Sequence, residues 1–196
     1  TLDKLLVGID NVTVIAINSI IDPKILYQNI YKNEKDPVIV IENKVDYGRF
    51  IGATELDAYS VKRSKDQFPV IKYSPTFDQP NLTLVTYGGI SQNVIESLLD
   101  LFIEIEAIVE VIVLTKISPL DITPVLESVR ISKRVIVIEE GSKEYGIGAE
   151  VIAQIFEHLG SKVDVAKRIG ALPYPIPSSQ NLENLVLPNT TLVEDI

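Results

Sequence analysis

The segment from Val135 to Glu150, VIVIEEGSKEYGIGAE, constrains the fold more than any other stretch of this 196-residue chain. A run of β-branched apolar residues ends in two carboxylates, Glu139 and Glu140, and glycines follow before an apolar helical pattern begins at Ala149. Short apolar runs bounded by turn residues are typical of strands buried on both faces. The segment predicts a strand, a loop and a helix, the order found in open α/β sheets, where ligands and partners bind beside the loop after a strand.

The same alternation of strands and helices recurs along the chain. It predicts an α/β fold: a three-layer domain with a mostly parallel sheet and helices on both faces, preceded by a fragment of a second α/β domain. Strand patterns lie at residues 12–17, 38–41, 82–86, 109–114, 135–138 and 163–169, and helical patterns begin at Asp22-Pro23, Ser91, Ile122 and Ala149.

Three regions of different character suggest the domain organisation. Residues 1–45 read as one strand–helix–strand unit, which cannot bury its own core, so we expect the tail of a preceding domain. Residues 46–80 are polar and interrupted by glycine and proline, which predicts an interdomain linker with one strand at 69–73. Residues 81–196 form the main domain. Because methionine is absent, even at position 1, we expect a piece of a longer polypeptide.

The composition excludes several classes of function. The net charge of −9 argues against a nucleic-acid or membrane-surface binder and would suit docking to a basic partner. Cysteine is absent and His158 is the single histidine, which leaves little room for thiolate, zinc or histidine-based chemistry. No apolar run reaches the roughly 18 residues that span a membrane. The default expectation is a cytoplasmic protein.

The glycines at 146 and 148 resemble part of a nucleotide-binding loop only superficially. A dinucleotide site requires a third glycine, and that position holds Val151. The structural interpretation is that Gly146 and Gly148 let the chain turn and let the following helix pack closely. His158, near the end of that helix, suits the negative end of the helix dipole better than a catalytic role.

Glu139 and Glu140 invite an interpretation as an acid–base pair. Adjacent strand residues point to opposite faces, so the two carboxyl groups would not naturally share a proton. We expect one of them to cap the following loop or helix and the other to meet a neighbouring subunit. The residues alone indicate a scaffold without a self-sufficient active site.

Taken together, six segments resemble the C-terminal half of the beta subunit of thiamin-diphosphate-dependent 2-oxo acid dehydrogenases of the pyruvate and branched-chain type. The order and spacing of the segments carry the resemblance. Transketolase shares this C-terminal domain and forms the wider neighbourhood. The segments are GIDNVTVIAINSIIDPKILYQNIYKNEKDPVIVIENK, LTLVTYGGIS, VEVIVLTKISPLD, SVRISKRVIVIEEG, GIGAEVIAQI and ALPYPIPSSQNLENLVLP.

The resemblance implies a parent enzyme that decarboxylates a 2-oxo acid oxidatively and passes the acyl group to a lipoyl arm. It implies thiamin diphosphate and Mg²⁺ as cofactors, held mostly outside this chain because the diphosphate belongs to the alpha side. The catalytic glutamate and histidines of the family also match no residue here. We therefore assign no catalytic residue and expect this piece to be inactive alone, serving subunit assembly and docking.

The resemblance also implies partners and lesser sites. The partners are an alpha subunit or alpha part, a second beta copy and the basic subunit-binding domain of the acyltransferase, so an oligomer is expected. A loop that holds K⁺ in some members corresponds to Tyr31, Glu34 and Asp36. The candidate residues for the subunit interface are Glu139, Glu140, Gly141, Gly146, Gly148 and Glu150, and those for acyltransferase docking are Glu157, Asp164, Glu183, Glu194 and Asp195.

Two alternatives remain open. The chain could belong to a transketolase or a deoxyxylulose-phosphate-synthase-like enzyme, which a basic phosphate-binding residue in the loop after Glu140 would favour; Lys143 is the nearest candidate. It could also be a non-catalytic interaction module that uses the fold without the chemistry.

Overall fold

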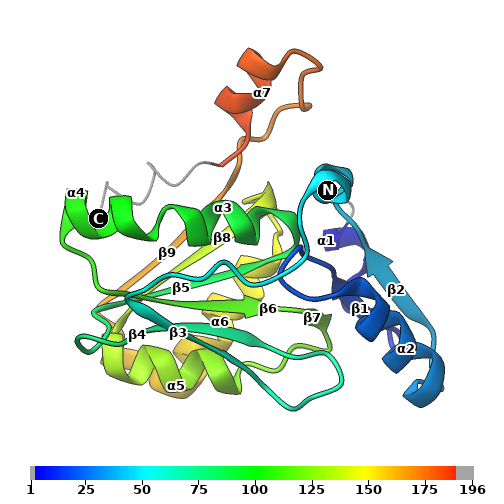
Figure 1. The fold of residues 1–196 in the computed structure, drawn as a ribbon, viewed down its shortest axis with the longest axis horizontal. Helices are drawn as coiled ribbons and strands as arrows, with labels where there is room; N and C mark the ends of the chain where they lie inside the picture. The colour runs from blue at the N-terminus through cyan, green and yellow to red at the C-terminus, as the bar shows by residue number, and fades with distance from the viewer. Residues whose placement is uncertain (1–2, 189–196) are drawn as a thin grey trace.

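A computed structural model describes residues 3–188 as two sheets with helices around them (Figure 1). The larger sheet has six strands in the order β3-β4-β6-β5-β8-β9, and the smaller has three in the order β2-β1-β7. In chain order the elements are α1 (Asp3–Leu6), β1 (Thr13–Ala16), α2 (Pro23–Asn33), β2 (Val38–Ile41), the 3₁₀ helix η1 (Lys44–Gly48), β3 (Tyr59–Arg63), β4 (Ile71–Pro75), β5 (Leu82–Tyr87), η2 (Gly88–Ile90), α3 (Ser91–Glu96), α4 (Leu98–Ile105), β6 (Val109–Leu114), β7 (Lys116–Ser118), α5 (Thr123–Ser132), β8 (Arg134–Ser142), α6 (Ile147–Leu159), η3 (Gly160–Lys162), β9 (Val165–Ala171) and α7 (Gln180–Val186).

The predicted mostly parallel sheet is confirmed. Strands β6, β5, β8 and β9 run parallel to one another, and β4 and β3 continue the sheet antiparallel at one edge. Strands β5 and β6 are buried along their whole length, which explains why most of their residues are apolar.

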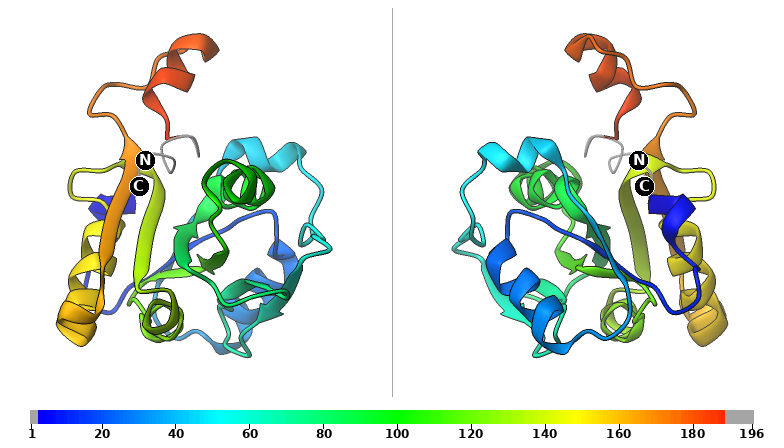
Figure 2. Two further views of the ribbon diagram at one scale, coloured as in Figure 1. Left: turned by 90° about the vertical axis from the view of Figure 1, so that its left-hand side faces the viewer. Right: turned by 90° about the vertical axis from the view of Figure 1, so that its right-hand side faces the viewer.

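Helices cover both faces of the six-stranded sheet, as predicted (Figures 1 and 2). Alternate residues of β5 enter different cores, because successive side chains of a strand point to opposite faces. Leu84 packs in the core that also contains Leu98 of α4. Val85 packs in the core that contains Val129 of α5 and Val151 of α6. Two apolar layers therefore enclose the sheet.

Residues 46–80 differ from the expected extended linker with one strand. They form two strands, β3 and β4, which pair with each other and extend the main sheet through β6. The pairing buries Ile71 and Tyr73 completely. In β3, Tyr59 and Val61 pack against the core while Lys62 and Arg63 stay exposed. These charged residues made a half-buried edge strand look like a polar linker.

Residues 13–41 form the predicted strand–helix–strand unit, with β1 and β2 parallel. Helix α2 begins as expected: the Asp22 side chain accepts a hydrogen bond of 2.9 Å from the backbone N–H of Lys24. An unpredicted strand, β7, pairs with the free edge of β1, and Ala16 N–H donates to the Thr115 carbonyl at 2.8 Å. The unit is thus tied to the chain that follows β6.

Three local predictions were wrong in detail. The helix expected to begin at Ser91 is divided at Ser97, whose hydroxyl donates to the Val94 carbonyl. Strand β8 continues to Ser142, so Glu139 to Gly141 lie within it. The segment after β9, where no helix was expected, contains α7. Within residues 3–188, the helices are too short or too polar to cross a membrane.

Candidate functional site

Glu139 lies near the C-terminal end of β8 and is completely buried. The backbone N–H of Gly148, in the first turn of α6, donates to Glu139 Oε1 at 3.2 Å. The first N–H groups of a helix have no partner within the helix and carry a partial positive charge, which a carboxylate satisfies. The expectation that one of the two carboxylates caps the following helix is confirmed.

This contact explains why positions 146 and 148 are both glycine. A Cβ atom on Gly146 would lie 2.3 Å from Glu139 Oε2, and one on Gly148 would lie 2.7 Å from Glu139 Oε1. Neither approach is tolerable for a side chain at a fixed backbone position. The glycines therefore admit the carboxylate of the same chain, and that carboxylate would repel a phosphate at this helix terminus.

Tyr87 and Asp3 complete a buried cluster with Glu139. In the parallel register of β5 and β8, Thr86 lies opposite Ile138, so Tyr87 and Glu139 are the next residues on the two neighbouring strands. The Tyr87 hydroxyl lies 2.6 Å from Asp3 Oδ2 and 3.1 Å from Glu139 Oε2. Asp3 is only 4% exposed. Three segments distant in sequence thus meet at one hydroxyl group.

The cluster changes the acidity of its members. Burial, and to a lesser extent the Asp3 charge, raise the pKa of Glu139 to about 7, against the opposing hydrogen bonds from Tyr87 and the start of α6. Burial and the two carboxylates raise the pKa of Tyr87 far above its ordinary value. A carboxyl group that titrates near neutrality can hold or release a proton under ordinary conditions.

Glu140 points to the other face of β8, as predicted. Its Oε2 accepts a hydrogen bond of 2.9 Å from Asn43 Nδ2, in the segment after β2. A Cβ atom on Gly89 would lie 2.2 Å from the same nitrogen, so only glycine leaves room for Asn43 there. Burial raises the pKa of Glu140, whereas the hydrogen bond from Asn43 lowers it.

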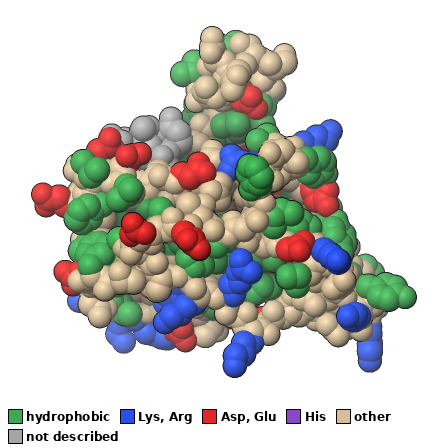
Figure 3. Space-filling view, viewed as in Figure 1, with side chains coloured by type: hydrophobic (Ala, Val, Ile, Leu, Met, Phe, Trp, Pro, Cys, Tyr) green, Lys and Arg blue, Asp and Glu red, His purple; other side chains and the backbone are tan. Residues whose placement is uncertain are grey.

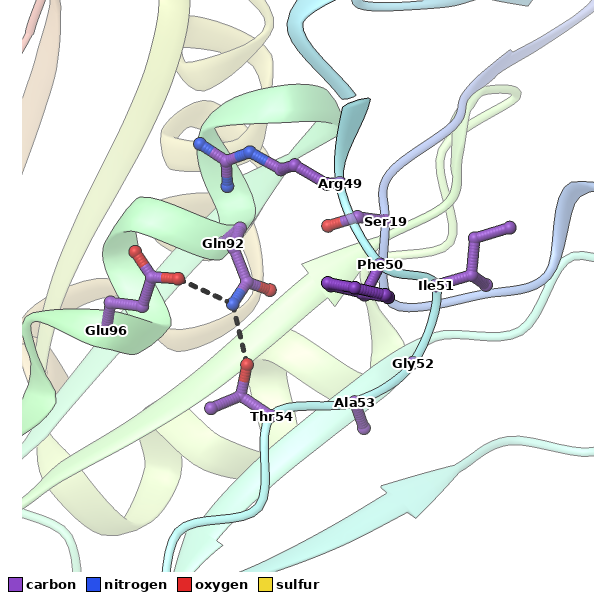
Figure 4. Close-up of a pocket in the computed structure, with 9 residues that line it drawn as sticks. All are labelled: Ser19, Arg49, Phe50, Ile51, Gly52, Ala53, Thr54, Gln92 and Glu96. Atoms are coloured by element: carbon purple, nitrogen blue, oxygen red, sulfur yellow. Dashed lines mark hydrogen bonds between the residues drawn. The ribbon is translucent and has the colours of Figure 1, made fainter. Parts of the chain in front are cut away.

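A pocket of about 500 Å³ opens between the segment after η1 and helix α3 (Figure 4). In its wall, Gln92 donates to Thr54 Oγ1 at 2.6 Å and to Glu96 Oε1 at 2.9 Å. Arg49 forms an ion pair of 3.5 Å with Asp46. These polar groups engage one another, and Phe50, Ile51 and Ala53 supply an apolar part of the lining.

Most of the proposed interface residues are buried within this chain. Glu139, Gly141, Gly146 and Gly148 are buried, and only Glu150 is exposed. Their positions explain local packing and leave their role in a subunit interface a prediction.

The docking candidates lie at two ends of the main sheet. Glu157, in the last turn of α6, and Asp164, just before β9, are exposed. Glu183 lies beyond the other end of β9, on α7, which projects from the body of the molecule (Figure 2). Glu194 and Asp195 fall outside the described residues.

The potassium loop stays a prediction. The Tyr31 side chain is 90% exposed and Asp36 is exposed, whereas Glu34 Oε1 accepts a hydrogen bond of 2.8 Å from Gln67. Across residues 3–188, no cluster of three or more His, Cys, Asp or Glu side chains could hold a metal ion.

Sequence reasoning missed Tyr87, Asp3 and Asn43. Tyr87 carried a usable signal, since it ends a buried strand at the same sheet edge as Glu139. Asp3 and Asn43 carried none, because their contacts join segments whose relative placement no local pattern specifies.

Comparison with known proteins places the chain in a family. A family model described as the transketolase C-terminal domain matches residues 75–193. The solved structure of a split-gene transketolase, described as an inactive beta4 tetramer, has a TM-score of 0.60 at 16% identity, covering 93% of this chain and 56% of that one. That likeness supports the predicted fold.

Curated relatives agree with the match. The chain is 32% identical to the mitochondrial pyruvate dehydrogenase E1 component subunit beta-1 of Arabidopsis thaliana, over 83% of this chain and 43% of the relative. It is 30% identical to the pyruvate dehydrogenase E1 subunit beta of Rhizobium meliloti, over 83% and 34%. It is also 30% identical to the beta subunit of acetoin:2,6-dichlorophenolindophenol oxidoreductase of Cupriavidus necator, over 82% and 45%. The chain spans less than half the length of these relatives, and it belongs to the transketolase C-terminal domain family.

Proposed function

We propose that this chain is the C-terminal half of the beta subunit, or beta part, of a thiamin-diphosphate-dependent 2-oxo acid dehydrogenase. The observation that carries the proposal is the similarity to pyruvate dehydrogenase E1 beta subunits over 83% of the chain. In this function the chain serves assembly and docking, and the parent enzyme decarboxylates a 2-oxo acid and transfers the acyl group to a lipoyl arm.

The described residues do not fit a complete thiamin diphosphate site. Among residues 3–188 there is no cluster of carboxylate or histidine ligands that could hold Mg²⁺. The start of α6, where a diphosphate would find N–H donors, holds Glu139 instead. In the proposed function, other parts of the enzyme therefore bind the cofactor, and the fragment is inactive alone.

Exposed apolar side chains support the assembly role. On α4, Leu99, Phe102 and Ile103 are exposed, and so is Phe77 between β4 and β5, whose ring meets that of Phe102 edge to face at a centroid distance of 5.7 Å. Figure 3 shows apolar side chains gathered over α4. Contiguous apolar surface of this kind marks contacts with other proteins. We propose that a second beta copy or the alpha part covers it.

Exposed carboxylates support the docking role. Glu157 and Asp164 are both exposed near the start of β9. A basic subunit-binding domain would be attracted by such carboxylates, which act mainly on the rate and orientation of binding. A binding site for a basic module fits the net charge of −9.

The proposal is tested with the native enzyme, purified through an affinity tag on this chain in its source organism. The expected result is reduction of an artificial electron acceptor that depends on a 2-oxo acid and on added thiamin diphosphate. Acetoin is tested in parallel, since one relative acts on it by name. Ketol transfer between sugar phosphates, with no reduction by any 2-oxo acid, would instead show the transketolase alternative.

A further inference from the structure

Helix α1 is held to the main sheet through one buried polar contact that the proposed function does not use. The Asp3 carboxylate accepts a hydrogen bond from the Tyr87 hydroxyl at 2.6 Å, while Leu6 and Val7 pack at the edge of the core beneath α6. The helix has four residues, so its own hydrogen bonds stabilise it little. Its position depends on these contacts with the sheet.

The number of protons in the cluster decides how well this contact is satisfied. The Tyr87 hydroxyl has one hydrogen, yet it faces Asp3 Oδ2 at 2.6 Å and Glu139 Oε2 at 3.1 Å. With both carboxyl groups ionised, one hydrogen faces two buried anions. With Glu139 protonated, its O–H donates to the Tyr87 oxygen and Tyr87 donates to Asp3. Each hydrogen then has an acceptor, and one buried charge is removed.

Some groups around Glu139 favour its ionised form, and others favour its protonated form. The N–H groups at the start of α6 favour its ionised form, and Gly148 N–H donates to Oε1. Burial and the Asp3 charge favour the protonated form. The ion pairs found in residues 3–188 are Arg49–Asp46 and Lys72–Glu110, so no cation of this range pairs with Glu139.

Neighbouring segments add further carboxyl groups and one amine. Across β8, Glu140 lies within the electrostatic reach of Asp3 and Asp46. The amino group of Lys4, next to Asp3, donates to the Glu144 carbonyl at 3.4 Å.

We propose that Glu139, Tyr87 and Asp3 form a proton-dependent latch, which holds α1 against the sheet while one proton is shared by the two carboxyl groups and loosens when that proton leaves. The latch joins the N-terminal unit to the main domain at the C-terminal ends of β5 and β8. It operates in the chain itself and does not depend on the identity of the enzyme or its substrate.

The direction of the pH dependence follows from linkage. Glu139 has a pKa of about 7 in the closed latch, against 4.5 for an ordinary glutamate. The state with α1 docked binds the proton of Glu139 more tightly than the state with α1 released. Rising pH therefore favours release of α1 between pH 4.5 and about pH 7, and a further rise in pH has little additional effect. Docking of α1 on the sheet is strongest below pH 4.5.

Hydrogen exchange at the Val7 amide reports the latch in the full chain, because Val7 N–H donates to the Asp3 carbonyl at 3.1 Å and closes the helical turn. We expect its protection factor to fall by up to about a hundredfold between roughly pH 5 and pH 7. Glu139→Gln should keep protection high and nearly independent of pH. The glutamine amide donates to Tyr87 permanently and still accepts from Gly148.

Two further variants keep the test decisive. Glu127→Gln changes an exposed carboxylate of α5 and should reproduce the wild-type curve. Asp3→Asn removes the like charge and should shift the fall in protection to lower pH. If circular dichroism shows that Glu139→Gln does not fold, the shift of the Asp3→Asn curve alone tests the latch. A flat wild-type curve, a Glu139→Gln curve with the wild-type pH response, or an unshifted Asp3→Asn curve would overturn the latch.

Discussion

Asn43 and Glu140, 97 positions apart in the sequence, are joined by a hydrogen bond of 2.9 Å from Asn43 Nδ2 to Glu140 Oε2. Asn43 also caps η1, because its Oδ1 accepts a hydrogen bond of 3.0 Å from the Val45 N–H. One amide thus uses its acceptor to shape the segment after β2 and its donor to hold that segment against β8. The contact couples the N-terminal unit to the main sheet.

Replacing Asn43 with aspartate tests this coupling. The carboxylate of Asn43→Asp keeps the cap on Val45 but faces Glu140 with a like charge. We expect the free energy of unfolding, measured by urea titration, to fall by roughly 1–3 kcal/mol near pH 8. The pKa of Glu140 is raised by burial, so protonation on acidification restores a hydrogen bond and the loss should shrink near pH 5.

Asn181→Asp, at an exposed position in the first turn of α7, is the matched control for Asn43→Asp and should not lower stability at either pH. An equal loss for Asn43→Asp at both pH values would contradict repulsion between the two carboxylates.

Gly146→Ala tests why glycine precedes α6. Its methyl group would fall 2.3 Å from the Glu139 carboxylate, so that carboxylate must leave the helix terminus or the helix must shift. Overpacking of this kind costs typically 1–3 kcal/mol. Gly48→Ala is the control, since a Cβ atom there meets nothing within 4 Å. Equal unfolding midpoints for the two variants in urea would show that the glycine at 146 is not required by the carboxylate.

Lys72 and Glu110 form an ion pair of 2.8 Å between β4 and β6, and the Glu110 side chain is 5% exposed. Lys72→Met leaves a buried carboxylate without its cation, which we expect to cost about 3–5 kcal/mol in thermal or urea unfolding. Lys62→Met, on the exposed edge strand β3, should have little effect.

The double variant of this pair gives the complementary result. Adding Glu110→Met to Lys72→Met removes the unpaired charge, so most of the lost stability should return. A double variant no more stable than Lys72→Met alone would mean that packing, and not the charge, is responsible.

The sequence predicted those parts of the fold that depend on local residue patterns. The buried strands β5, β6 and β8 are rich in apolar residues, and Asp22-Pro23 marks the start of α2 by residues that a helix start favours. The glycines before α6 were correctly interpreted as packing residues. These features depend on residues that are close together in the sequence, so they can be predicted without knowing the tertiary structure.

The missed features depend on distant contacts. Strand β3 exposes its charged residues because it lies at the sheet edge, and β7 is a strand only because β1 offers it an unpaired edge. The meeting of Asp3 with Tyr87 and Glu139 requires the placement of α1 on the sheet. The sequence predicted that Glu139 and Glu140 diverge, and the structure supplied their separate partners.

We propose that this chain docks a 2-oxo acid dehydrogenase to its acyltransferase core. This claim is tested most directly by calorimetric titration of the folded chain with the subunit-binding domain of a lipoyl-bearing acyltransferase from the same organism. We expect saturable binding that weakens at high salt, and weaker binding for a Glu157→Gln, Asp164→Asn double variant than for Glu127→Gln on α5. No heat of binding at low salt, from a chain that circular dichroism shows to be folded, would contradict the claim.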